Sequence, residues 1–182
     1  MTDVVNLLDI KSIRIEQLSP ECRIDLFRCG VEEIDRWVRN KAAKHHKLNR
    51  TKIFCAFDVD AASIAGFYCL SFSSEDANKV TGQHRDIYRP TGVPLVYVTY
   101  VAVAKCLQGK GLGTFLLLDA MRRSYIVSQH VAFYGIGLRS LNDRTTALYT
   151  KLGFGATDTE KFPLLILPVW TLTDLFAGPA PD

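Results

Sequence analysis

The residues whose types and spacing best suit chemistry form a glycine-rich stretch between two apolar runs. It reads Gln-Gly-Lys-Gly-Leu-Gly over residues 108–113, with residues 95–104 before it and 114–128 after it. The first run is almost all β-branched, aromatic or small, which is typical of a strand covered on both faces; the second consists of strong helix formers. Alternate glycines leave backbone N–H groups unshielded, and the first turn of a helix adds more, with its positive dipole end. The pattern predicts an anion site suited to a phosphate or pyrophosphate, and the alternative is a tight strand-to-helix turn that binds nothing.

The composition indicates one compact domain over residues 1–182. Hydrophobic residues make up 48% of the chain, and no apolar run approaches the roughly 20 residues of a membrane helix. The N-terminus carries acids where a signal peptide carries basic residues, so we expect a cytoplasmic protein with no membrane partner. The five cysteines show neither a C-x-x-C pair nor a neighbouring histidine pattern, which predicts buried free thiols and no metal site. The Gly- and Pro-rich tail, about 178–182, is expected to be disordered.

Hydrophobic periodicity and turn residues predict an α+β protein in which helices flank a mixed sheet. Besides the two elements around the glycines, we expect strands over 13–18, 53–58, 64–73, 131–138 and 164–172, and helices over 29–48 and 142–153. The strands 53–58 and 64–73 are expected to form a hairpin, and residues 75–93 a loop with a short helical piece. Gly135 and Gly137 are expected to let a neighbouring strand approach closely.

The helix over 29–48 is expected to carry an uneven charge. The stretch from Arg36 to Lys52 has no acid, although the whole chain has a net charge of only +3, and it holds seven basic residues: Arg36, Arg39, Lys41, Lys44, Lys47, Arg50 and Lys52. Two interpretations stand, a solvated helix face or a surface that contacts nucleic-acid phosphates. The apolar stripe of a regular helix would contain Ile34, Trp37, Val38 and Leu48. Lys41 and His45 would lie on it too, where either their stems pass the core edge or they face a cleft and meet a ligand.

Gln108, Gly111 and Gly113 match the Gln/Arg-x-x-Gly-x-Gly pyrophosphate loop of the GNAT acetyltransferases, and the expected order of elements is that of this fold. Three further stretches resemble the toxin branch of this superfamily, found in bacterial type II toxin-antitoxin pairs. They are the Cys-Gly-x-x-x-Ile-Asp-x-Trp-Val signature over 29–38, the stretch from Asn142 to Phe154, and residues 167–176, which resemble the C-terminal strand of these toxins.

This resemblance implies a toxin that transfers acetyl from acetyl-CoA to the α-amino group of aminoacyl-tRNA and so blocks translation. It also implies a ribbon-helix-helix antitoxin that neutralises the toxin, contact with operator DNA only through that antitoxin, and a homodimer. By position, backbone groups of Val101 and Val103 would hold the pantetheine arm, Asn142 would lie by the cofactor and Tyr149 would be the general acid. The pyrophosphate would be held by Gln108, Gly109, Lys110, Gly111, Leu112, Gly113 and Thr114, and tRNA by Arg36, Arg39, Lys44 and Lys47.

The reaction needs an amine in its free-base form. An α-amino group with a pKa near 8 meets this condition far better than a lysine with a pKa of about 10.4, so Tyr149 without an obvious carboxylate partner is consistent with an α-amine acceptor. The alternative for Tyr149 is a helix-face aromatic packed beside Ala147 and Leu152. One departure concerns the acceptor, because relatives often have an arginine where this chain has Tyr100, which cannot replace its charge. Two rival functions remain: a GNAT enzyme that acetylates a small amine or a protein N-terminus, and a CoA-binding regulator without significant turnover.

Overall fold

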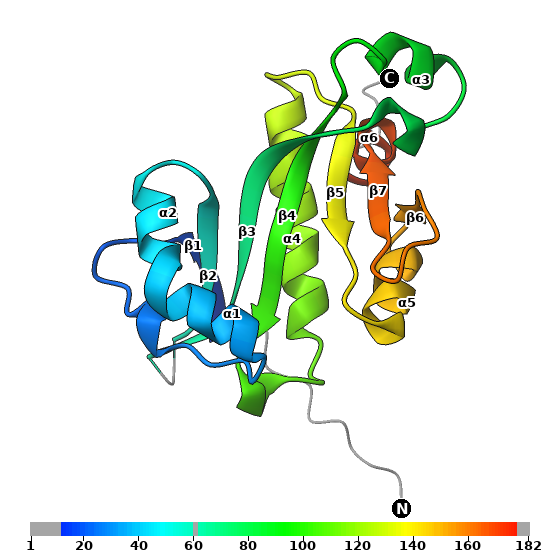
Figure 1. Cartoon of the computed structure of the whole chain (residues 1–182). Coiled ribbons are helices and arrows are strands. Elements are labelled where there is room, and N and C mark those ends of the chain that lie inside the picture. The colour runs from blue at the N-terminus through cyan, green and yellow to red at the C-terminus, as the bar shows by residue number, and fades with distance from the viewer. Residues whose placement is uncertain (1–11, 60–61, 178–182) are drawn as a thin grey trace, which may run out of the picture. The chain divides into compact units, whose positions relative to one another are not determined.

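The computed structural model describes residues 12–59 and 62–177. The strands follow the order β1-β2-β3-β4-β5-β7-β6 in a seven-stranded sheet, which confirms the predicted mixed sheet with helices (Figure 1). The chain divides into two compact units, Met1–Leu70 with Tyr100–Asp119 and Ser71–Thr99 with Ala120–Asp182. They are called unit 1 and unit 2 below. Three long elements contribute residues to both units: β3 (Ser63–Glu75), β4 (Val93–Val103) and α4 (Leu112–Ser128).

Unit 1 contains the predicted N-terminal strand and hairpin. β1 (Ile13–Gln17) pairs antiparallel with β2 (Lys52–Asp58), and β2 pairs antiparallel with β3. Side chains from β2, from β3 and from the 3-10 turn η2 (Ile24–Leu26) belong to one core, in which Phe27 contacts Phe67 edge to face with ring centroids 5.1 Å apart. The predicted N-terminal strand and the predicted hairpin are both confirmed. Their apolar residues alternate or run continuously, as expected for strands that are buried on one or both faces.

The helix predicted over 29–48 begins at Glu32 and contains an irregular turn. It consists of α1 (Glu32–Trp37), a π-helical turn η3 (Val38–Ala42) and α2 (Ala43–Lys47). The buried apolar positions are Ile34, Val38 and Ala42, whereas Leu48 is 58% exposed, so the predicted stripe was wrong at its end. A π turn holds more residues than an α turn. It therefore rotates Lys41 to an exposed position instead of leaving it on the apolar stripe.

Unit 2 contains the beginning of β4 and the three strands that follow it in the sheet. β5 (Gly135–Arg139) pairs parallel with β4 and antiparallel with β7 (Leu164–Pro168), and β7 pairs with the short β6 (Gly155–Ala156). A Cβ on Gly135 would collide with the Leu167 carbonyl, and one on Gly137 would come within 2.8 Å of Leu95, which confirms the close approach predicted for these glycines. β5 is shorter than predicted, and Val131 is 51% exposed.

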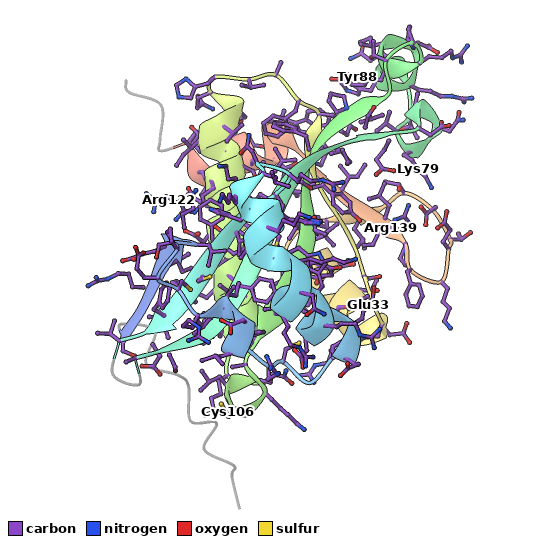
Figure 2. The ribbon with its side chains drawn as sticks, turned by 60° about the vertical axis from the view of Figure 1, so that its left-hand side comes forward. Glu33, Lys79, Tyr88, Cys106, Arg122 and Arg139 are labelled. Carbon is purple, nitrogen blue, oxygen red and sulfur yellow. The ribbon has the colours of Figure 1, made fainter. Side chains whose placement is uncertain are left out.

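The segment 75–93 was predicted to be a loop with one short helical piece, and it contains two, η4 (Ala77–Lys79) and α3 (Gln83–Tyr88). Lys79, labelled in Figure 2, anchors this segment to the chain that follows β6. Its Nζ lies 2.6 Å from Asp158 and 3.6 Å from Glu160, and Glu160 also accepts from Arg139 over 3.2 Å. Lys79 and Asp158 are less than one-fifth exposed, so this pair is more stabilising than a fully solvated one.

The two C-terminal helices differ in how well the sequence predicts them. α5 (Asp143–Lys151) is capped by Asn142 as predicted, in a capping box with Thr145. The strand predicted over 164–172 is wrong beyond Pro168, because residues 169–176 form α6 (Val169–Phe176), which packs against β5 and β7. β5 begins at Gly135, the partner of Pro168, so the ladder has no further residue of β5 to pair with. The predicted disorder of the tail 178–182 falls outside the described residues.

Candidate active site

The glycine-rich loop connects β4 to α4 in unit 1. After a 3-10 turn, η5 (Lys105–Leu107), the chain extends at Gln108 and then takes left-handed backbone conformations at Gly109 and Gly111, with φ of +77° and +85°. A Cβ at either glycine would meet no atom within 4 Å, so the loop borders open space there. The first α4 hydrogen bond joins the Phe115 N–H to the Gly111 carbonyl, at 3.2 Å.

This geometry suits an anion. The N–H groups of Leu112, Gly113 and Thr114 precede the first helical hydrogen bond, and a helix offers its first-turn N–H groups no acceptor further back in the chain. The 17-residue α4 adds the positive end of its dipole at the same place. Leu112 is 1% exposed and so anchors the start of the helix in the core. The loop can therefore hold a pyrophosphate by backbone groups alone, with room for it over Gly109 and Gly111.

The Gln108 side chain faces the protein backbone. Its Nε2 donates to the carbonyl of Cys29 over 2.8 Å and to the carbonyl of Val103 over 3.0 Å. Both amide protons are thereby engaged, and a glutamine has no other donor on its side chain. In this arrangement Gln108 holds the loop in place, and a pyrophosphate would be bound by the N–H groups that follow it.

Val101 and Val103 lie on the last part of β4, both half-buried. The ladder between β4 and β5 covers Leu95–Tyr97, and β4 continues beyond it to Val103. On its other side, β4 approaches β3 closely, because a Cβ on Gly66 would lie 2.8 Å from the Ala102 carbonyl. The backbone of Val101 and Val103 is thus outside the β5 ladder, as a strand that pairs with an extended ligand must be.

Asn142 and Tyr149 belong to unit 2. The Asn142 Oδ1 accepts from the Thr145 N–H over 2.9 Å, so this side chain caps α5. The half-buried Tyr149 ring has its centroid 6.2 Å from that of Phe154. Burial raises the pKa of the Tyr149 phenol above its ordinary value of 10. A phenol that stays protonated at neutral pH is available as a proton donor.

The basic helix lies in unit 1, and most of its charged side chains are in solvent. Arg36 is 3.5 Å from Glu32, which offsets part of its charge. Arg39, Lys44 and Lys47 are exposed on η3 and α2. Lys41, on η3, is exposed as well, so a polyanion would meet four cations on this stretch in addition to Arg36.

The helix also carries groups with structural roles that the sequence did not indicate. His46 is half-buried, and its Nδ1 accepts the Ile53 N–H over 3.1 Å. Burial, and then the charge of Lys52, lower the pKa of His46. Trp37 packs on Tyr100 with ring centroids 4.7 Å apart and contacts His45 at 5.8 Å. Tyr100 is thus an aromatic neighbour of Trp37. Burial raises the pKa of its phenol above the ordinary value, so this side chain is neutral.

The cysteines and a cavity in unit 2 are two other features that could form a site. Cys29, Cys55 and Cys69 are buried free thiols as predicted, but Cys106 is exposed on η5 (Figure 2) and Cys22 is half-buried. A cavity of about 630 Å³ in unit 2 is lined by Asp76, Ala77, Asn78, Arg85, Arg89 and Gly92. None of the residues predicted for the site lines this cavity.

Comparisons with known proteins identify the family and related folds. Residues 15–154 match the model of the acetyltransferase (GNAT) family. The tRNA-acetylating toxin of Mycobacterium tuberculosis (strain ATCC 25618 / H37Rv) is 27% identical over 141 residues, which cover 78% of this chain and 83% of the toxin.

Solved structures share the fold. A tyrosine-to-phenylalanine mutant of KacT has a TM-score of 0.82 at 24% identity, covering 91% of this chain and 99% of KacT. AtaT complexed with acetyl-methionyl-tRNAfMet has a TM-score of 0.79 at 22% identity, covering 90% and 99%. A mutant of the toxin AtaT bound to the C-terminus of the antitoxin AtaR has a TM-score of 0.75 at 22% identity, covering 92% and 99%.

Proposed function

Since the chain belongs to the acetyltransferase (GNAT) family, we propose that it is a toxin that acetylates the α-amino group of aminoacyl-tRNA. Acetyl-CoA is the acyl donor in this family. The assignment of aminoacyl-tRNA as the acceptor rests on the similarity to a tRNA-acetylating toxin over 78% of the chain. Aminoacyl-tRNA whose α-amine is blocked cannot accept a growing peptide, so the reaction would stop translation in the cytoplasm.

The glycine loop fits the donor. In the proposed complex, N–H groups from Gly111 to Thr114 hold the pyrophosphate, and the open space over Gly109 and Gly111 admits it. The backbone of Val101 and Val103 holds the pantetheine arm as an added strand would be held. Gln108 keeps the loop in position through the Cys29 and Val103 carbonyls, and Asn142 shapes the start of α5.

The chemistry requires one proton to move from nitrogen to sulfur. The neutral α-amine attacks the thioester carbonyl, the carbon–sulfur bond breaks, and the nitrogen loses a proton as the amide forms. We assign Tyr149 as the general acid that protonates the leaving thiolate, after which the surplus proton of the amide nitrogen restores the phenol through solvent. Burial supports this role, because it keeps the phenol protonated until well above neutral pH.

The basic helix and the partners complete the proposal. Arg39, Lys44 and Lys47, with a smaller contribution from Arg36, contact tRNA phosphates through charge. The likeness to AtaT supports an antitoxin partner for this chain too. We infer that this antitoxin has a ribbon-helix-helix end that contacts operator DNA, and that the toxin is a homodimer, as the toxin branch of the family implies.

The test is to incubate the purified protein with radiolabelled acetyl-CoA and total charged tRNA, with deacylated tRNA as the control. We expect label on charged tRNA alone, released with the amino acid by mild alkali. Label on deacylated tRNA would contradict an α-amine acceptor. Binding of acetyl-CoA without label on any RNA would favour a small amine or a protein N-terminus as the acceptor. Negligible turnover on every amine would instead indicate a CoA-binding regulator.

A further inference from the structure

The turn before the basic helix is organised by one buried carboxylate. Asp35 is 6% exposed and lies in the first turn of α1. Its Oδ1 accepts the Cys29 N–H over 2.8 Å and the Cys29 thiol over 3.2 Å, and its Oδ2 accepts the Gly30 N–H over 3.1 Å. Gly30 has a φ of +87°, a conformation that favours glycine, so the chain reverses sharply at this point.

The ionisation states suit a fixed network. Burial alone would raise the pKa of Asp35, but the hydrogen bonds from Cys29 and Gly30 outweigh it and lower the pKa below its ordinary value. Burial raises the pKa of the Cys29 thiol to about 11, so this thiol remains a donor. A charged acceptor with three donors forms strong, short hydrogen bonds and leaves little freedom in the turn.

The same turn holds the entrance of the glycine loop. The peptide group between Cys29 and Gly30 is bound on both sides, since the Gly30 N–H donates to Asp35 over 3.1 Å and the Cys29 carbonyl accepts from Gln108 over 2.8 Å. The Arg28 carbonyl accepts the Lys105 N–H over 3.1 Å, which joins the turn to η5 as well. Gln108 continues the connection to the end of β4 through the Val103 carbonyl. All of these residues belong to unit 1.

We propose that Asp35 is a positioning residue for the pyrophosphate loop, acting through the Cys29–Gly30 turn and the Gln108 amide. In this proposal Asp35 does not contact acetyl-CoA. The Asp35 carboxylate fixes the direction of the Cys29 carbonyl, and this carbonyl holds the Gln108 side chain. The position of Gln108 in turn sets where the chain enters the turn at Gly109 and Gly111. The inference rests on the proposed function insofar as this loop is the CoA site. It gives the Cys-Gly and Asp positions of the 29–38 signature a task in donor binding.

The experiment is a double-mutant cycle on donor affinity. CoA binding is measured by calorimetry, without any acceptor, for the wild type, Asp35→Asn, Gln108→Ala and the double variant. Asparagine retains one acceptor oxygen, but its NH₂ group faces the Gly30 N–H, so the turn loses its charge and one bond. The matched control is Asp25→Asn, which removes the same charge from an exposed carboxylate paired with Arg23 at 3.0 Å in the same unit.

We expect Asp35→Asn to weaken CoA binding about tenfold, with turnover at saturating acetyl-CoA within about twofold of wild type. In the Gln108→Ala background the same substitution should change CoA affinity less than twofold, although it lowers the melting temperature equally in both backgrounds. The control should bind CoA as the wild type does.

An undiminished effect of Asp35→Asn in the Gln108→Ala background would overturn the proposal, because the carboxylate would then act by another route. An unchanged CoA affinity in Asp35→Asn alone would overturn it too. If Asp35→Asn does not fold, Asp35→Glu, which keeps the charge but displaces it, is used in the same cycle with the same criteria. The readout is independent of the acceptor: failure to label charged tRNA would reject the proposed function while the cycle on CoA still tests Asp35.

Discussion

Replacing Gly111 by alanine separates the two properties that this glycine supplies, its backbone conformation and its open surroundings. At a φ of +85° an L-residue is strained by about 1–2 kcal/mol. An added Cβ would meet no atom within 4 Å, so no steric term adds to this strain. For a protein of this size, a loss of 1 kcal/mol lowers the melting temperature by about 2–4 °C. The folded protein should therefore survive Gly111→Ala with a modest decrease in stability.

CoA affinity should fall much further than stability. The new methyl group would occupy the space where a pyrophosphate oxygen approaches the N–H groups that begin α4. Losing one hydrogen bond to a charged oxygen costs about 1.5–3 kcal/mol, which corresponds to about a 10- to 150-fold rise in the dissociation constant. Calorimetry should show this loss for CoA, whereas the weak affinity for pantetheine, which lacks the pyrophosphate, should not change.

Gly82→Ala is the matched control. Gly82 also has a positive φ, of +60°, and nothing within 4 Å of an added Cβ, but it precedes α3 in unit 2. This variant should lose stability and bind CoA as the wild type does. If Gly111→Ala bound CoA normally, or weakened CoA and pantetheine equally, the loop would not be the pyrophosphate site.

Three further predictions concern Tyr149, the basic side chains of the helix and His46. Tyr149→Phe should bind acetyl-CoA normally and lose more than about 100-fold in turnover. Since burial raises the pKa of this phenol above 10, the wild-type rate should rise with pH as the α-amine deprotonates near pH 8 and should not fall before about pH 10. Reversing Arg39, Lys44 and Lys47 to glutamate should reduce the slope of log tRNA affinity against log salt by about 2–3, at about 0.7–0.9 per phosphate contact, and leave CoA affinity unchanged. The folded-state pKa of His46 lies below its ordinary value of 6.5, so its contribution to stability is present above pH 6.5 and is lost as the pH falls through the folded-state pKa. Urea unfolding should therefore show a larger loss between pH 7.5 and 5.5 for the wild type than for His46→Gln, and equal losses would contradict this linkage.

The elements that the sequence predicts well are those whose signals are local. The cap of α5 at Asn142 and the glycines of the loop depend on contacts within a few residues, and the structure has both. The π turn η3 is different. Val38 and Ala42 of this turn pack into the core, and no residue type in the sequence predicts a π turn here. α6 shows a third case. Its β-branched residues favour a strand, yet Leu172 is fully buried on a helix because the ladder with β5 ends at Pro168.

The candidate site divides in the same way, and the division explains which substitutions the loop should tolerate. A site made of backbone N–H groups requires glycine where φ is positive and leaves the intervening side chains freer, so alternate glycines are readable from one sequence. The residues that support this site lie far apart in the sequence, so the spacing within the loop does not reveal their contacts. Gln108 and Cys29 are 79 positions apart, and their hydrogen bond depends on a turn that Asp35 closes from a third position. A chain could keep every glycine of the loop and still bind CoA poorly if this turn were lost. The presence of the glycine pattern alone is therefore a weaker predictor of donor affinity than the pattern together with the Cys-Gly turn and Asp35.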